Sequence, residues 1–172
     1  MHGLEAGGGI ILNSKRAKMY YKLSSQTLTS KYDFKFIGID DVIELATVML
    51  DSLKDTCEDR GETLGDIIEE IESVIGGSFA PFISEASYRI IQNEETAAAI
   101  MISYYEGYPL ISEIFTNKKY QNSGMASSLI KKSVNSLLDM GYKDLILNVD
   151  IENIAAVNLY RKIGFEVNAT VL

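Results

Sequence analysis

The sequence predicts an α+β fold in which helices flank one central sheet. Three observations support it. Several short segments carry alternating or continuous apolar residues, which is typical of strands, whereas others repeat apolar residues every three or four positions, which is typical of helices. Three strand segments follow one another in the middle of the chain. Strands and helices alternate after them, so we expect a mixed sheet, antiparallel first and partly parallel at its C-terminal side.

The first half of the chain predicts one strand followed by two helices. Residues 33–39 alternate between apolar and polar side chains, which predicts a strand. Asp41 with Glu44 resembles a capping box at the start of the first helix. Thr63 is expected to begin the second helix, and Gly76-Gly77 to end it. The apolar positions at helical spacing are Val42, Leu45, Ala46, Met49, Leu50 and Leu53 in the first helix, and Ile67, Ile68, Ile71, Val74 and Ile75 in the second.

The second half predicts an antiparallel meander and then alternating helices and strands. Turn residues at 93–95 and 106–109 separate the meander strands, and Gly141 and Gly164 end the two helices. The expected elements are strands at 88–92, 96–105 and 110–116, a helix at 125–140, a strand at 145–149, a helix at 154–163 and a final strand at 165–171.

The composition limits the chemistry available to the chain. Its 172 residues, 47% of them apolar, suit one domain with one sizeable core. There is one cysteine, Cys57, and one histidine, His2. These counts exclude an intrachain disulfide and argue against a Ser–His–Asp triad and a Cys- or His-ligated metal centre. We therefore expect no metal, and a chemistry built on carboxylates, Tyr, Lys, hydroxyl groups or backbone amides.

The same features bear on location and organisation. No apolar run approaches the roughly 20 residues of a membrane span, and the glycine-rich start lacks the features of a signal peptide. We expect a soluble cytoplasmic protein that binds neither membranes nor, given its net charge of −8, nucleic acid. We divide it into a partly flexible N-terminal extension, residues 1–30, and a single domain, residues 31–172.

The negative charge is concentrated in one stretch. Residues 51–72 carry a net charge of −7, whereas residues 117–162 carry +3. One interpretation is a solvated acidic helix face beside a mildly basic tail. The other is a cationic ligand near the acidic helices and an anionic ligand on the C-terminal half.

A turn of small residues, 120–126, lies between a predicted strand and a long predicted helix. The first N–H groups of a helix have no internal partner and carry partial positive charge, so small residues there allow a phosphate to approach. Gly124 and Ala126 remove bulk at the needed places. The pattern differs from the common nucleotide-binding glycine motifs. The alternative is an ordinary helix start with Ser123 as N-cap.

A second segment follows the next strand and carries Asn153, Ala156, Leu159-Tyr160 and Gly164-Phe165. Together with Gln121, Gly124 and Ala126, it resembles the GNAT superfamily of acyl-CoA-dependent N-acetyltransferases, whose members carry [R/Q]-x-x-G-x-[G/A] and then N-x-x-A-x-x-L-Y-x-x-x-G-F. The likeness is strong over residues 110–167. It implies a three-layer α/β sandwich with a mixed, partly splayed central sheet.

The resemblance implies an acetyl-CoA site without a metal. The turn amides would hold the pyrophosphate, and the backbone of the preceding strand would pair with the pantetheine arm. Asn153 and Tyr160 would contact the cofactor from the next helix. The residues that this assigns to the cofactor are Ile114, Phe115, Thr116, Gln121, Asn122, Ser123, Gly124, Met125, Ala126, Asn153 and Tyr160.

The resemblance also implies a reaction, in which a primary amine attacks the thioester directly in a ternary complex. Tyr160 would protonate the departing thiolate, since a tyrosine with a pKa of about 10 keeps its proton at neutral pH. Glu113 is the candidate base, and ordered water is the alternative. Direct transfer needs no cysteine nucleophile, so Cys57 is assigned as a helix residue.

In this family, the two helices after the first strand line the acceptor site. Asp55, Asp59 and Glu62 lie at the join between them, which favours a cationic acceptor: a polyamine, a small amine, or a peptide or protein amine. Many members also continue into a seventh strand, which here would have to be replaced by a segment such as residues 19–28 or by a second subunit. We expect a monomer or homodimer.

A second hypothesis is a non-catalytic CoA-sensing or protein-interaction domain of the same fold. The motifs around Gly124 and Tyr160 argue against it, and the expected lack of the family's seventh strand and the unproven base argue for it. A nucleotide-binding module is disfavoured, because no Lys-Ser/Thr pair follows the glycine turn.

Overall fold

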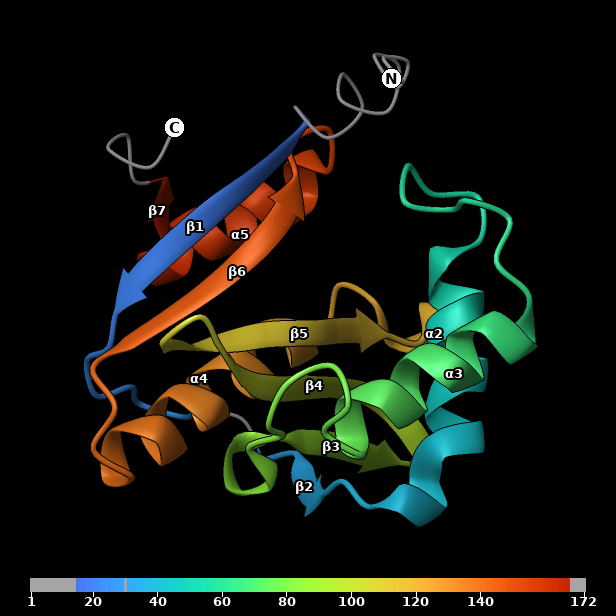
Figure 1. Ribbon diagram of the computed structural model, residues 1–172, viewed down its shortest axis with the longest axis horizontal. Helices are drawn as coiled ribbons and strands as arrows, with labels where there is room; N and C mark the ends of the chain where they lie inside the picture. Colours follow the sequence, from blue (N-terminus) through green and yellow to red (C-terminus); the bar gives the residue numbers. More distant parts are fainter. Residues whose placement is uncertain (1–14, 30, 168–172) are drawn as a thin grey trace.

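The computed structural model describes residues 15–29 and 31–167 of the chain (Figure 1). Their strands are β1 (Arg16–Lys22), β2 (Asp33–Phe36), β3 (Tyr88–Gln92), β4 (Glu95–Tyr105), β5 (Tyr108–Thr116), β6 (Asp144–Asp150) and β7 (Glu166–Val167). Their helices are α2 (Val42–Leu53), α3 (Leu64–Ile75), α4 (Met125–Asp139) and α5 (Ile154–Ile163), with short 3₁₀ turns η1 (Ile39–Asp41), η2 (Ser84–Ala86) and η3 (Lys118–Tyr120). No helix of this described part is long and apolar enough to cross a membrane.

All seven strands form one mixed sheet in the order β2-β3-β4-β5-β6-β1-β7. Only the β5–β6 pair is parallel; the other neighbours are antiparallel. The predicted α+β fold with a mixed sheet is therefore confirmed. The last predicted strand, 165–171, is observed as Glu166–Val167, and residues 168–171 lie outside the described part.

Helices cover both faces of the sheet. Side chains alternate between the two faces of a strand, so neighbouring residues of β4 belong to different apolar clusters. Ala98 and Ile100 pack in the cluster that includes the buried side of α4, whereas Ala99 and Met101 pack in the cluster under α2 and α3. Figure 1 shows α2 and α3 over the β3–β5 part of the sheet, while α5 lies behind β1 and β6. No helix of the described residues covers the front of β6 and β1 in this view.

The meander turns are tighter than the sequence predicts. Asn93 and Glu94 connect β3 to β4, and Glu106 and Gly107 connect β4 to β5, all four at positive φ. Two consecutive residues at positive φ match the right-handed twist of the flanking strands. The strands consequently begin earlier than predicted, at Glu95 and Tyr108.

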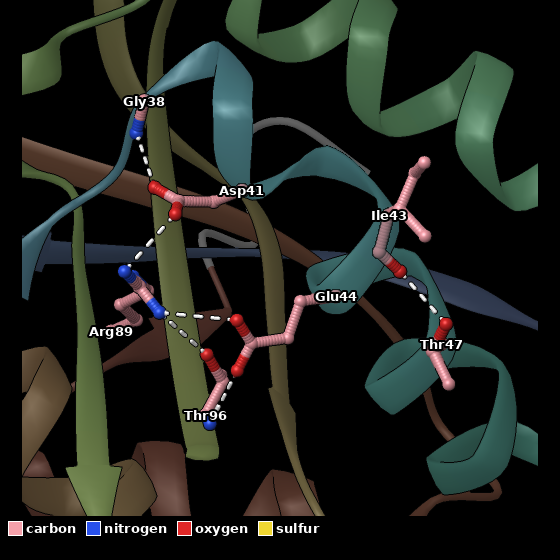
Figure 2. Close-up of polar contacts among 7 residues, drawn as sticks. All are labelled: Gly38, Asp41, Ile43, Glu44, Thr47, Arg89 and Thr96. Carbon is pink, nitrogen blue, oxygen red and sulfur yellow. Dashed lines mark hydrogen bonds and ion pairs between the residues drawn. The ribbon is translucent and has the colours of Figure 1, made fainter. Parts of the chain in front are cut away.

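The predicted capping box of the first helix is not formed as expected. Asp41 Oδ2 accepts from the Gly38 amide at 2.8 Å, while Glu44 Oε2 accepts from the Thr96 amide at 2.7 Å. Between the two carboxylates lies Arg89, with Nη2 3.0 Å from Asp41 Oδ1 and Nη1 donating to Thr96 Oγ1 at 2.9 Å (Figure 2). These contacts attach the start of α2 to β3 and β4. They fix the position of the helix whose other end borders the site described below.

The N-terminal strand is an integral part of the sheet. Residues 1–30 were expected to precede the domain, but β1 pairs antiparallel with β6 along its whole length and with β7 at Met19 and Tyr20. Met19 is fully buried. The segment that lies beside β6 is thus Arg16–Lys22, and the domain includes it. The prediction that the first residues are flexible concerns residues 1–14, which lie outside the described part.

Loss of β1 is expected to destabilise the protein strongly. Deleting residues 1–22 should abolish cooperative thermal unfolding, because β6 and β7 would lose their shared neighbour. Met19→Ala should lower the free energy of unfolding by about 2–4 kcal/mol, since it leaves a cavity in the core. Lys22→Ala on the exposed end of the strand is the control, with an expected change below about 0.5 kcal/mol. Urea unfolding measures both, and equal stabilities of the two variants would contradict the placement of Met19.

Candidate active site

The site begins where β5 and β6 separate. The two strands pair only at Leu110–Ile146 and Ile111–Leu147. Directly after this pair the β4–β5 register shifts, so that Ile111 faces Ile102 and Glu113 faces Met101, with Ser112 as an extra residue. A bulge of this kind bends the strand and increases its twist. It directs the second half of β5 away from β6 and opens the sheet.

A cleft of about 860 Å³ occupies this opening. Its walls come from β5, the turn before α4, the start of α4, β6, the start of α5, the end of α2 and the loop after α2. The predicted site residues that line it are Glu113, Ile114, Phe115, Thr116, Gln121, Asn122, Gly124, Met125, Ala126, Asn153 and Tyr160. The predicted site residues that do not line it are Ser123, Asp55, Asp59 and Glu62.

At one end of the cleft, the first amides of α4 have no side-chain cap. The N-cap residue is Gly124 at φ +81°, not Ser123, so the predicted alternative of a serine cap is wrong. The Ser123 hydroxyl instead donates to the Tyr120 carbonyl. Uncapped amides at a helix N-terminus form a ready site for an anion, and those of Met125 and Ala126 belong to residues that line the cleft.

The diverging half of β5 offers a second backbone surface. Ile114, Phe115 and Thr116 pair with β4 on one side only, because β6 has moved away on the other. An unpaired strand edge presents N–H and C=O groups that an extended ligand can pair with. Gln121 Nε2 donates to the Thr116 carbonyl at 3.3 Å and joins this edge to the turn.

Tyr160 reaches the cleft from α5. Its side chain is 7% exposed and packs edge-on against Phe165, while its hydroxyl makes no hydrogen bond with any residue that the structure describes. Burial, with a smaller contribution from the negative charge of Glu58, raises its pKa to about 12. The phenol therefore keeps its proton and can give it to a bound group.

Glu113 lies on the face of the sheet covered by α2 and α3, because it is opposite Met101. Burial is the main cause that raises its pKa well above the usual 4.5. A hydrogen bond with the Glu70 side chain and the negative charges of Glu70 and Glu58 raise the pKa further, whereas the charge of Arg16 lowers it by a smaller amount. A carboxyl group with a raised pKa holds a proton more tightly, and once ionised it is a stronger base.

Asn153 connects two walls of the cleft. It is the N-cap of α5, where Oδ1 accepts from the Ala156 amide at 3.2 Å, and its Nδ2 donates to Glu58 Oε2 at 2.7 Å. Lys118 Nζ donates to the Lys54 carbonyl at 2.9 Å near the other end. The loop between α2 and α3 is thereby held across the cleft.

The acidic residues of that loop divide into two groups. Asp59 accepts from the amides of Asp55 and Gly61, which lower its pKa, and Glu62 accepts from the Arg60 amide. These contacts shape the loop itself. The residue of the loop that turns its carboxylate into the cleft is Glu58.

Cys57 is not a helix residue as expected, since α2 ends at Leu53. It is exposed in the loop and lines the cleft. Desolvation, followed by the charges of Asp150 and Glu58, raises its pKa. A thiol with a raised pKa is a poor nucleophile.

Residues 55–165, well over half of the chain, match the Acetyltransferase (GNAT) family. The chain belongs to this family. A search of curated proteins finds no significant sequence match. Among solved structures, the GNAT domain is similar to a GCN5-related N-acetyltransferase from Sphaerobacter thermophilus, with a TM-score of 0.69 and 12% identity over 96% of this chain and 54% of that one. This chain thus spans about half of that protein.

Two other solved structures align with this chain over a larger share of their own length. The PaiA N-acetyltransferase from Thermoplasma acidophilum, solved in complex with coenzyme A, gives a TM-score of 0.64 at 14% identity over 81% of this GNAT chain and 92% of that one. The ribosomal-protein-S18-alanine N-acetyltransferase from Escherichia coli gives 0.60 at 18% identity over 79% and 78%. At these identities the likeness shows the shared fold.

Among the residues that line the GNAT cleft and were not predicted as site residues are Glu58 and Arg16. Glu58 is one of nine acids in a single stretch, and its spacing does not distinguish it from its neighbours. Arg16 comes from β1, which the family motifs do not include. The sequence suggested that a segment near Met19 could join the sheet, but it did not identify the neighbouring strand. It therefore could not place Arg16 in the cleft.

Proposed function

We propose that this GNAT protein transfers an acetyl group from acetyl-CoA to a primary amine by direct attack in a ternary complex. The observation that carries the proposal is the cleft between β5 and β6, which extends from the uncapped amides of α4 to Tyr160 and Glu113. The coenzyme A in the Thermoplasma relative supports the same donor.

In this proposal the chain holds the donor mainly through its backbone. The amides from Gln121 to Ala126, Ser123 included, surround the pyrophosphate, with Gly124 allowing close approach. The free edge of β5 at Ile114–Thr116 pairs with the pantetheine arm. Asn153 and Tyr160 border the thioester end.

The reaction needs two proton transfers. The neutral amine attacks the thioester carbonyl and forms the C–N bond, and Glu113, directly or through water, takes the proton that the nitrogen loses. The C–S bond then breaks with its electron pair on sulfur. Tyr160 gives the sulfur a proton, and the hydroxyl regains one from solvent.

The acceptor enters on the α2–α3 side. Glu58 and Glu113 line that space, and Glu70 lies beside Glu113. The negative charges of Glu58 and Glu70 favour a protonated amine approaching from solvent. Asp55, Asp59 and Glu62 add to the negative potential from the outer side of the loop. Polyamines, small amines and peptide amines fit this description.

Glu113→Gln is expected to change the pH profile. A raised pKa keeps Glu113 protonated to higher pH, so kcat/KM of the wild-type protein should rise with pH through a step above 4.5. The glutamine variant should lose that step and about 10²-fold of the rate. Glu69→Gln, an exposed residue of the same α3 helix as Glu70, is the control. A step that persists in Glu113→Gln would assign the proton to water.

A panel of amines tests the function. Acetyl-CoA is incubated with polyamines, amino acids and peptides, and released thiol and acetylated product are measured. Turnover with at least one amine is expected. Tight CoA binding without turnover across the panel would favour the non-catalytic CoA-sensing domain instead.

A further inference from the structure

The strand β1 forms a wall of the acceptor side that carries positive charge. Arg16 lies opposite Asp150 and Lys18 opposite Asn148 in the β1–β6 register. Paired residues share a face, and Leu147 and Val149 occupy the opposite one, against α4 and α5. Arg16 therefore lies on the open front of the sheet, the face to which Glu113 also belongs, and it lines the cleft.

Within the described residues, the neighbouring cations Lys15 and Lys18 have ion-pair partners and Arg16 has none, while Asp150 opposite Arg16 accepts from the Glu152 amide at 2.9 Å. Lys15 Nζ lies 3.0 Å from Glu152 and Lys18 Nζ lies 3.7 Å from Glu106. The Arg16 guanidinium makes no ion pair or hydrogen bond with any residue in 15–29 or 31–167. Among the described residues that line the cleft, Arg16 is the cation, so its guanidinium can meet a ligand there.

Arg16 lines the same cleft as the two candidate reacting groups, Glu113 and Tyr160. Its charge acts to lower the pKa of Glu113 and of Tyr160, against the larger raising effect of burial. Glu58 and Glu113 line the same cleft, and Glu70 forms a hydrogen bond with Glu113. The acceptor space therefore has the carboxyl groups of Glu58 and Glu113 and the guanidinium of Arg16 in its walls.

We propose that Arg16 binds a carboxylate of the acceptor, so that the acetylated amine belongs to an amino acid. The proposal rests on the function proposed above and names its substrate class. The ammonium group faces the glutamates before it loses its proton, and the carboxylate faces the guanidinium. Two opposed charges orient a small acceptor in a way that a single negative wall does not. Arginine suits this role because its planar group meets a carboxylate with two parallel hydrogen bonds.

The test compares acceptors that differ by one carboxylate. Initial rates of CoA release are measured with L-lysine and cadaverine, and with L-arginine and agmatine. The wild-type protein should prefer the amino acid of each pair. Arg16→Gln should reduce the ratio of kcat/KM within each pair about 10-fold or more, and Arg16→Lys should reduce it less. The matched control is Lys22→Gln, which removes one positive charge from the same face of β1, outside the cleft, and should leave the ratio unchanged.

The proposal would be overturned if the wild-type protein showed no preference for the amino acid of each pair. It would also be overturned if Arg16→Gln lowered kcat/KM equally for both members of each pair. A raised KM for acetyl-CoA in Arg16→Gln would place the donor at Arg16 and would overturn it as well. A tripeptide and its C-terminal amide, run in parallel, distinguish a free amino acid from a peptide: a preference for the peptide acid larger than that for lysine would overturn the amino-acid assignment.

Calorimetry separates this proposal from the function proposed above. L-lysine and cadaverine are titrated into CoA-saturated wild-type and Arg16→Gln protein. If no amine is turned over, the proposed function fails, yet weaker binding of lysine alone to Arg16→Gln would still support the carboxylate site. Equal binding of lysine to both proteins would overturn it.

Discussion

Tyr160→Phe is expected to lower kcat by about 10²–10³-fold while leaving CoA affinity nearly unchanged. The variant keeps the ring that packs on Phe165 and removes only the proton that the departing sulfur requires. Because the pKa of Tyr160 is about 12, the wild-type hydroxyl stays protonated through the neutral and moderately alkaline range. No loss of rate from its ionisation is expected there.

Stopped-flow measurement of thiol release gives kcat, and calorimetric titration with CoA gives the affinity for CoA. Tyr142→Phe is the matched control, since Tyr142 packs near Tyr104 away from the cleft. A kcat within a factor of about two of the wild-type value would show that sulfur takes its proton from elsewhere.

Gly124→Asp is expected to weaken CoA binding roughly 100-fold. Aspartate tolerates the left-handed conformation at φ +81°, and nothing lies within 4 Å of the new Cβ. Its carboxylate would compete for the uncapped α4 amides and repel the pyrophosphate. The loss of two hydrogen bonds to a charged group, about 3 kcal/mol together, corresponds to that factor.

Gly141→Asp provides the control for this change. Gly141 also has positive φ, +93°, and open space for a Cβ, but it follows the C-terminal end of α4. Titrations of CoA into both variants measure the change in affinity, which is expected only for Gly124→Asp. An affinity of Gly124→Asp within about threefold of the wild-type protein would place the pyrophosphate away from this turn.

The part of the fold that follows from local pattern was predictable. The helical stripes of α2 and α4 and the apolar strand β6 appear where expected, because periodicity reports which face is buried. The glycine turn was recognised from Gly124 and the later Tyr160 motif. The structure places both residues in one cleft.

What depends on contacts between distant residues was not predictable. Glu44 accepts from Thr96, 52 positions away, instead of closing a local capping box. The place of β1 between β6 and β7 likewise depends on long-range pairing, so Arg16 could not be assigned to the cleft from the sequence. In the loop after α2, irregular backbone decides that Glu58 faces the cleft while the Asp59 carboxylate accepts from the amides of Asp55 and Gly61.

The most direct test of acetyl transfer is to quantify both products of one reaction. Wild-type protein is incubated with acetyl-CoA and the best amine of the panel, and mass spectrometry measures acetylated amine and free CoA over time. We expect the two to form in equal amounts, with both rates reduced together in Tyr160→Phe. Free CoA without acetylated amine, or no release of CoA with any amine, would contradict direct acetyl transfer in this cleft.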